Sequence, residues 1–214
     1  MRAILLGVLI SVAAMMPNAL AAEPSREQSV RDLSSPVAET RRAAAVKRGE
    51  SGRMSDVATL VKALSDRDEQ TREIAEAAIW QIWGRSGDAG IDELYQKGVA
   101  LMNFGAAREA IQVFTLIIAQ KPDFAESWNK RATLYYSIGE YQKSLHDCDE
   151  VVKRNPLHFG ALAGYGLIYT QLDQPERAVD YFQRALKINP NMHGVAQNIE
   201  LLEQQGKAKR KNFI

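Results

Sequence analysis

The sequence predicts an all-α protein, a right-handed solenoid of repeated helix hairpins that follows a separate helical segment. Three observations support this prediction: prolines recur at a fixed period, the residues between them repeat in kind, and a shorter period runs through the N-terminal part. Pro122, Pro156 and Pro190 are each 34 residues apart. A constant period of this length is typical of stacked helix hairpins.

The period divides residues 91–192 into three units, 91–124, 125–158 and 159–192, with a proline at place 32 of each. Places 4, 8, 11, 20 and 24 define the core of a unit. In the first unit they hold Leu94, Gly98, Leu101, Ala110 and Phe114. In the second they hold Trp128, Ala132, Tyr135, Ser144 and Cys148, and in the third Leu162, Gly166, Tyr169, Ala178 and Phe182. Small residues at places 8 and 20 let two helices approach, and larger ones fill the space around that contact.

On these residues the chain resembles the tetratricopeptide repeat family, whose pattern is W-x2-L-G-x2-Y, then A-x3-F, then P. The chain departs from the pattern at place 7, where the family has leucine and the three units have Lys97, Arg131 and Tyr165. In the second unit Ala132 replaces the glycine and Cys148 replaces the aromatic residue. Both replacements keep the approximate size, so we expect the packing to survive.

The loops inside the units carry their own signals. Gly105 and Gly139 suit helix ends that need a positive φ. In the third unit, Asp173 followed by Pro175 suits the start of a helix.

Residues 33–90 contain a second, shorter repeat. Leu33-Ser34 recurs as Leu64-Ser65, Thr40-Arg41 as Thr71-Arg72, and Ala44 as Ala75, always 31 residues apart. Apolar residues follow helical spacing in this segment. The pattern resembles two short HEAT units, and the alternative is plain helical packing that caps the array. The glycine-rich stretch 84–88 forms the junction with the first unit.

Residues 193–206 predict one more amphipathic helix, ended by Gly206, that covers the last apolar face of the array. A basic tail, 207–214, follows it. We expect the apolar core to run without interruption from about Val57 to Leu202.

The first residues predict a secretory signal peptide over 1–21, with a linker over 22–32. Arg2 precedes an apolar run from Ala3 to Met16, and Ala19-Leu20-Ala21 forms an A-x-A end. The apolar run is short for a membrane span, although an uncleaved anchor is the alternative. We therefore expect a periplasmic or secreted bacterial protein with no membrane span after cleavage.

Charge argues against a nucleic-acid binder. The chain has 27 basic and 26 acidic residues, and the predicted signal holds one arginine and no acid, which leaves 26 of each. A nucleic-acid binder needs a basic excess or stripe. The basic cluster at Lys207, Lys209, Arg210 and Lys211 is either a solvated chain end or a contact for an anionic surface.

The sequence predicts no enzyme, no cofactor and no metal site. It lacks a G-x-S-x-G motif and a phosphate-binding glycine loop with its lysine. His146, Asp149 and Glu150 share a helix face, but three ligands on one exposed helix rarely suffice for zinc. Cys148 has no cysteine to pair with and falls at a core place.

The resemblance implies that the first helix of each unit lines a concave face through places 2, 5, 9 and 12. The candidate partner-binding residues are Tyr95, Val99, Met102, Asn129, Lys130, Thr133, Tyr136, Leu167 and Thr170. Tyrosine suits this task because it offers a large area with a polar tip. The alternative is that Tyr95 or Tyr136 braces the neighbouring unit. Gly160, Ala163 and Gly164 leave room for a bulky ligand side chain or another helix.

Some members of this family clamp the acidic C-terminus of cytosolic chaperones with lysine, asparagine and arginine at set places. Here those places hold Tyr95, Val99, Lys130, Gly160 and Gly164, so the clamp is absent. The sequence therefore predicts a module that binds a protein or peptide segment in its groove. The alternative is a structural or assembly factor of the cell envelope that acts by self-association.

Overall fold

The computed structural model describes residues 26–211, all of whose regular elements are helical. The predicted signal peptide, 1–21, lies outside the described residues. The predicted linker, 22–32, is corrected in its second part, because Arg26–Asp32 forms helix α1. The helical N-terminal segment therefore begins before residue 33.

The N-terminal segment consists of two helix hairpins related by the 31-residue period. The first pairs α1 with α2 (Ala38–Ser51), and the second pairs α3 (Val57–Ala63) with α4 (Glu69–Trp83). A short 3-10 turn, Met54–Asp56, leads into α3. Asp68 caps α4 by accepting a hydrogen bond from the backbone N–H of Thr71. The pairs seen in the sequence therefore occupy equivalent positions in consecutive hairpins.

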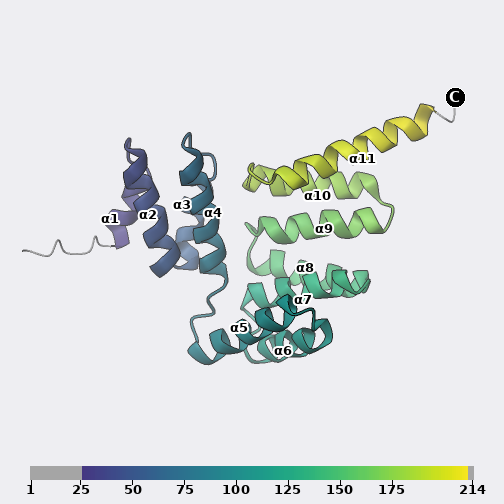
Figure 1. Ribbon diagram of the computed structural model, residues 1–214, viewed down its shortest axis with the longest axis horizontal. Helices are drawn as coiled ribbons and strands as arrows, with labels where there is room; N and C mark the ends of the chain where they lie inside the picture. The colour runs from purple at the N-terminus through teal and green to yellow at the C-terminus, as the bar shows by residue number, and fades with distance from the viewer. Residues whose placement is uncertain (1–25, 212–214) are drawn as a thin grey trace, which may run out of the picture.

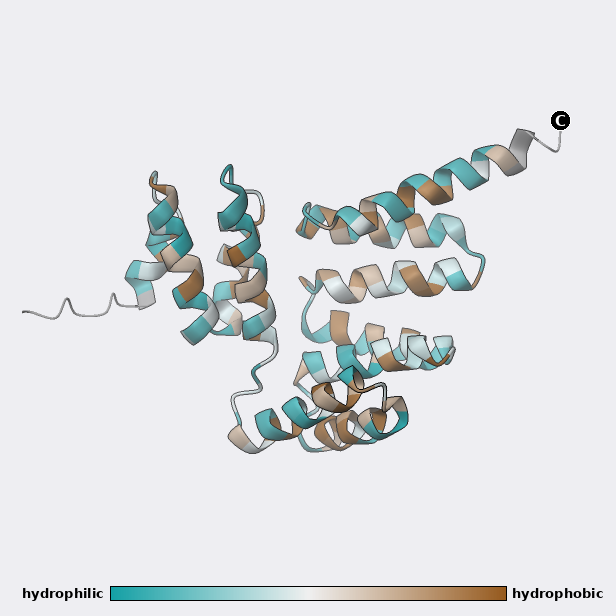
Figure 2. Ribbon diagram, in the orientation of Figure 1, coloured by the Kyte–Doolittle hydropathy of each residue, from teal (hydrophilic) through white to brown (hydrophobic). Residues whose placement is uncertain are grey.

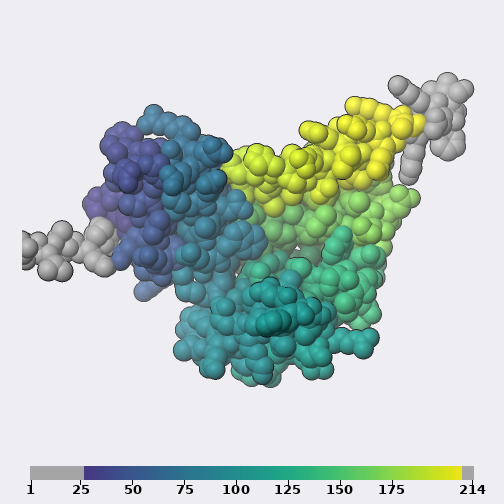
Figure 3. Space-filling view, in the orientation of Figure 1, coloured from purple at the N-terminus to yellow at the C-terminus, as the bar shows by residue number. Residues whose placement is uncertain are grey.

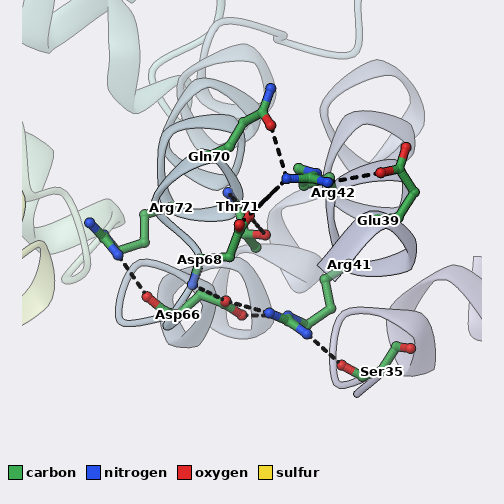
Figure 4. A network of polar contacts seen from close by, with 9 residues as sticks. All are labelled: Ser35, Glu39, Arg41, Arg42, Asp66, Asp68, Gln70, Thr71 and Arg72. Carbon is green, nitrogen blue, oxygen red and sulfur yellow. Dashed lines mark hydrogen bonds and ion pairs between the residues drawn. The ribbon is translucent and has the colours of Figure 1, made fainter. Parts of the chain in front are cut away.

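Two arginines repeat their contacts at the same period (Figure 4). Arg41 donates to the carbonyl of Ser35 at 2.8 Å, and Arg72 donates to the carbonyl of Asp66 at 3.0 Å. Arg41 also forms a bidentate pair with the Asp66 carboxylate, both distances being 2.7 Å. Arg72 has no third hairpin to reach, and it donates instead to the side-chain oxygen of Asn191 at 3.0 Å. Equivalent arginines thus make both connections: Arg41 links the first hairpin to the second, and Arg72 links the second hairpin to the array.

The array consists of three helix hairpins and a final helix. Its elements are α5 (Ala89–Asn103), α6 (Ala107–Gln120), α7 (Ala125–Ser137), α8 (Tyr141–Arg154), α9 (Phe159–Gln171), α10 (Pro175–Ile188) and α11 (His193–Lys211). Most helices carry both hydrophilic and hydrophobic residues, whereas α9, which is packed on several sides, is largely apolar (Figure 2). The predicted solenoid of helix hairpins is confirmed.

Small-against-large contacts hold each hairpin together. A Cβ added to Gly98 would lie 2.8 Å from the ring of Phe114, and one added to Gly166 would lie 2.4 Å from Phe182. In the second unit the equivalent pair is Ala132 and Cys148, both buried in one apolar cluster. The two departures from the family pattern therefore compensate each other, since a larger residue on the first helix faces a smaller one on the second.

The turns between the two helices of each unit share one backbone conformation. Gly105 and Gly139 have φ values of 77° and 78°, as predicted. Asp173 holds the same place with a φ of 52°, and Gln174 is the residue before α10. Asp173 is therefore a turn residue and not the helix cap that the sequence suggested. Aspartate tolerates this left-handed region better than most residues do. Pro175 is the first residue of α10, as predicted.

The N-terminal hairpins do not stack on the first repeat, although the chain enters the array there. Helix α4 runs along the edge formed by the turns between repeats (Figure 1), and the N-terminal part directly adjoins the third repeat and α11 (Figure 3). Phe159 lies in the same apolar cluster as the core of α2, α3 and α4. Asn191 donates to the carbonyl of Leu64 at 2.8 Å.

The expectation of one core running in sequence order is therefore wrong. The described apolar residues form three clusters, and the N-terminal cluster shares Ile188 and Met192 with the cluster of the third repeat. The chain turns at the junction 84–88. As a result α4 packs against apolar residues that lie far along the sequence, such as Phe159 and Met192.

Helix α11 starts where the sequence predicts it but does not end at Gly206. It continues to Lys211 and takes in the first part of the predicted basic tail. A glycine weakens a helix without necessarily ending it. Val195, Ile199 and Leu202 pack on the third repeat, as a capping helix requires. Within the part that the structure describes, none of the helices combines the length and apolar character that crossing a bilayer requires.

We expect Gly166→Ala to lower the free energy of unfolding by about 2 kcal/mol, because its Cβ would overlap the Phe182 ring. Urea denaturation of the full chain measures this loss. Phe182→Leu in the same chain should recover part of it, so that the double variant loses less than the sum of the two. Gly194→Ala is the matched control, since nothing lies within 4 Å of its added Cβ. Equal effects at the two glycines would contradict the packing argument.

The Asp66 carboxylate should make the stability of the N-terminal hairpins depend on pH. Its hydrogen bonds from Arg41 hold the pKa of Asp66 below the ordinary value of 3.8. A depressed folded-state pKa adds stability above the unfolded pKa, and this stability is lost as the pH falls through the folded pKa. Asp66→Asn should therefore lower the denaturation midpoint at pH 7, and the difference from the parent should shrink below about pH 4. Glu73→Gln, at an exposed carboxyl, should show neither effect.

Candidate functional site

The concave side of the array is built by the first helices of the repeats, α5, α7 and α9, continued by α11. Helix α11 repeats the register of α9, because Val195, Ile199 and Leu202 are packed at the places that Ala161, Tyr165 and Ile168 hold in α9. Leu201 therefore falls at the same place as Leu167. Both side chains are open to solvent, 54% and 37% exposed.

Places 9 and 12 of these four helices hold eight residues, and the seven other than Gln204 form what we call the outer groove. They are Val99, Met102, Thr133, Tyr136, Leu167, Thr170 and Leu201. Thr133, Leu167 and Leu201 are exposed, and the other four are half-buried. The ring of Tyr136 lies 5.8 Å from that of Tyr141, which holds it against its own hairpin. The hydroxyls of Thr133 and Thr170 donate to the carbonyls of Asn129 and Gly166 in their own helices.

The other half of the concave side, at places 2, 5 and 6, is covered by α4. A Cβ added to Gly160 would lie 2.6 Å from the indole of Trp80, so only glycine leaves room for this ring. Lys130 places its ammonium 5.8 Å from the centroid of the same ring. Of the space that the sequence left open for a bulky side chain or another helix, the part at Gly160 is thus taken by a helix of this chain, whereas a Cβ added to Gly164 would meet only Cys148.

A buried carboxylate lies beneath this cover. Glu126 is almost fully buried, and its oxygens accept hydrogen bonds from Asn129 Nδ2 at 3.1 and 3.2 Å. Lys130 Nζ lies 3.1 Å from the same carboxylate, and His158 Nε2 lies at 2.8 Å. Burial alone would raise the pKa of Glu126, but the contacts with His158 and Lys130 outweigh it and hold that pKa below its ordinary value.

The hydrogen bonds of His158 define its tautomer. Its Nδ1 accepts the backbone N–H of Ala161 at 3.0 Å and so caps α9. The proton of a neutral ring must then be on Nε2, which donates it to Glu126. The ring stacks on Trp83 at 4.2 Å between centroids and meets Trp80 edge-on at 5.5 Å. His158 therefore joins the second repeat, the third repeat and α4 at one point.

Two predicted groove residues are corrected by their burial. Tyr95 is packed between Phe114 and Phe124, with centroids 6.0 and 5.4 Å away. Burial raises the pKa of its hydroxyl, and so does its hydrogen bond with Glu126. Asn129 is also buried, and its amide is committed to Glu126. Tyr95 is therefore enclosed by rings of its own unit and reaches the second unit only through Glu126.

The remaining candidate residues separate into two groups. Lys130 lies at the seam with α4, where its charge is compensated by Glu126. A surface depression of about 480 Å³ follows this seam; its lining is Trp80, Gln81, Gly84, Arg85, Tyr95, Gln96, Glu126 and Lys130. The other six, at places 9 and 12 of α5, α7 and α9, are Val99, Met102, Thr133, Tyr136, Leu167 and Thr170.

The described residues contain no group of histidine, cysteine and carboxylate side chains suited to hold a metal ion. Cys148 is buried, and this burial raises the pKa of its thiol to about 12. A thiol with so high a pKa is protonated at neutral pH and unreactive. The prediction that Cys148 acts as an apolar filler is therefore confirmed.

Sequence reasoning missed Trp80, Trp83 and His158 as parts of this site. The two tryptophans are three residues apart at the end of α4, so they share a helix face. A pair of large aromatic residues on one face requires an apolar surface to cover it. Gly160, which lacks a side chain at the start of the third unit, was the signal for where that surface is.

Comparison with known proteins agrees with the repeat architecture. The model of the tetratricopeptide repeat matches residues 129–193. A TPR repeat-containing protein of Rhizobium etli is 33% identical over 123 residues, which are 58% of this chain and 60% of that protein. The Hsp70-Hsp90 organizing protein 1 of Glycine max is 25% identical over 123 residues, 57% of this chain and 22% of the relative. The chain thus spans less than two thirds of either relative.

Solved structures show the same fold. The crystal structure of MamA superposes with a TM-score of 0.53 at 18% identity and covers 73% of this chain and 82% of its own. The first TPR of Spaghetti (RPAP3), bound to the HSP90 peptide SRMEEVD, has a TM-score of 0.52 at 23% identity and covers 54% and 91%. Together with the three hairpins at a 34-residue period, these matches show the fold of a helix-hairpin solenoid, and the match to the tetratricopeptide repeat covers residues 129–193.

Proposed function

We propose that this chain is a periplasmic or secreted interaction module that binds a segment of a protein or peptide in its outer groove. The observation on which this proposal rests is the outer groove itself. It continues across α5, α7, α9 and α11, and it leaves Leu167 and Leu201 exposed although the array has a buried core elsewhere. Exposed apolar side chains that gather on one concave face are typical of partner-binding surfaces.

The compartment follows from the first residues. A basic residue, an apolar run and the A-x-A end at 19–21 support export with cleavage after Ala21. The lone, buried cysteine agrees with either compartment, because it has no partner to form an internal disulfide.

Binding of a chaperone tail is not part of the proposal, although an Hsp70-Hsp90 organizing protein is similar to this chain and the Spaghetti repeat binds an HSP90 peptide. The places that the clamp would use hold buried Tyr95, ion-paired Lys130 and two glycines, of which Gly160 lies under Trp80. A terminal carboxylate would find no free cation there.

A photoreactive amino acid in place of Tyr136 should cross-link a partner in cells that express the protein at its native level. The same amino acid in place of Phe104 is the matched control. Phe104 is 89% exposed but lies at the turn after α5, outside the outer groove. We expect at least tenfold more adduct at residue 136, identified by mass spectrometry. Equal yields at the two sites would contradict the groove, and a dominant adduct with a second copy of this chain would favour the self-associating assembly factor.

Residues 1–21, fused to a reporter enzyme that is active only outside the cytoplasm, should give activity in a bacterial host. The same reporter fused to a chain that begins at Ala22 should be inactive. The mass of the exported full chain should match an N-terminus at Ala22 or Glu23. An inactive fusion would refute export, and an exported chain that keeps residues 1–21 would show an uncleaved anchor.

A further inference from the structure

The outer groove carries no charge. All seven of its residues are apolar, hydroxyl-bearing or aromatic, and place 13 beside them holds Asn103, Ser137, Gln171 and Gln205. Charged groups lie at its edges: Lys130 is paired with buried Glu126 at 3.1 Å, and Asp173 shares a small pocket with Thr170. Residues with unpaired charges would therefore lose hydration on entering this groove without gaining a partner.

The groove offers two apolar anchors at equivalent places. Leu167 and Leu201 come from neighbouring first helices, and each leaves a large part of its side chain in water. Both helices contribute side chains to the apolar cluster of the third repeat. An amphipathic helix, which repeats apolar residues at intervals of three and four along one face, could cover both leucines.

One side of the groove is closed. Trp80 lies over Gly160, and α4 covers the half of the concave side where the first helices begin. A segment in the outer groove must therefore lie across the four helices without turning its end into the inner half.

We propose that the outer groove binds an internal, uncharged stretch of a partner, with apolar residues on one face, and discriminates against acidic segments and free C-termini. This inference rests on the proposed function and specifies its partner class. Charge complementarity supports it, because the seven groove residues include no cation that could pair with an acidic segment, whereas a neutral apolar segment needs none.

The test uses the full chain and three fluorescent peptides. The first is an acetylated and amidated 14-residue peptide with leucine at positions 2, 5, 9 and 12 and glutamine or serine elsewhere. The second replaces three of its glutamines by glutamate, and the third is SRMEEVD with a free carboxylate. Fluorescence anisotropy should show at least tenfold tighter binding of the neutral peptide than of either acidic one.

Substitutions in the groove should alter this preference. Leu167→Lys should weaken the neutral peptide about tenfold and reduce or reverse its advantage over the glutamate peptide, since the new ammonium pairs with glutamate. Phe104→Lys, which adds the same charge outside the groove, should leave the order unchanged. Circular dichroism checks that both variants keep the helical content of the parent.

Three results would overturn the inference: no binding of the neutral peptide, equal or tighter binding of an acidic peptide, or an unchanged order in Leu167→Lys. Failure here is separable from failure of the proposed function. If residue 136 cross-links a partner while the neutral peptide does not bind, the groove is a binding surface and only its partner class is wrong.

Discussion

The contact between α4 and the turn that joins the second and third repeats determines how much of this molecule is available for binding. Trp80 and Trp83 reach across from α4 to His158 and Phe159 with ring centroids 4.2 to 5.5 Å apart. Large aromatic side chains contribute most to such contacts because each removes a large apolar area from water. The same contact buries Glu126 and covers Gly160, and it leaves half of the concave side open.

Much of the fold was predictable because its determinants are local. The 34-residue period fixed the helix hairpins of the array, and the positive φ values at Gly105 and Gly139 followed from residue type. Even the exchange at Ala132 and Cys148 could be judged from size alone. The 31-residue period likewise predicted the N-terminal hairpins, whose arginines repeat their contacts at that interval. The positive φ of Asp173 was not predicted, because an aspartate there adopts the backbone conformation that glycine adopts in the other two units.

The site was less predictable because it depends on contacts between distant segments. Periodicity assigns Tyr95 and Asn129 to the concave side, but it does not report that Phe114 and Phe124 enclose Tyr95 or that Glu126 accepts hydrogen bonds from the Asn129 amide. It also does not report that Arg72 and Asn191 are neighbours, since 119 residues separate them. Outer-groove residues such as Thr133 and Leu167 lie beyond the reach of α4, and for them the periodic assignment agrees with their exposure.

The bond between Arg72 and Asn191 has a consequence for mechanics. A free solenoid behaves as a chain of nearest-neighbour contacts, so it can bend, twist and fray from either end. Here the N-terminal hairpins are connected to the first repeat by the chain itself. They are also connected to the end of the third repeat by side-chain hydrogen bonds of Asn191. These two connections restrict changes in the curvature of the array. They also couple the unfolding of the first repeat to that of the third. A ligand would thus meet a rigid scaffold, and little conformational entropy would be lost when it docks.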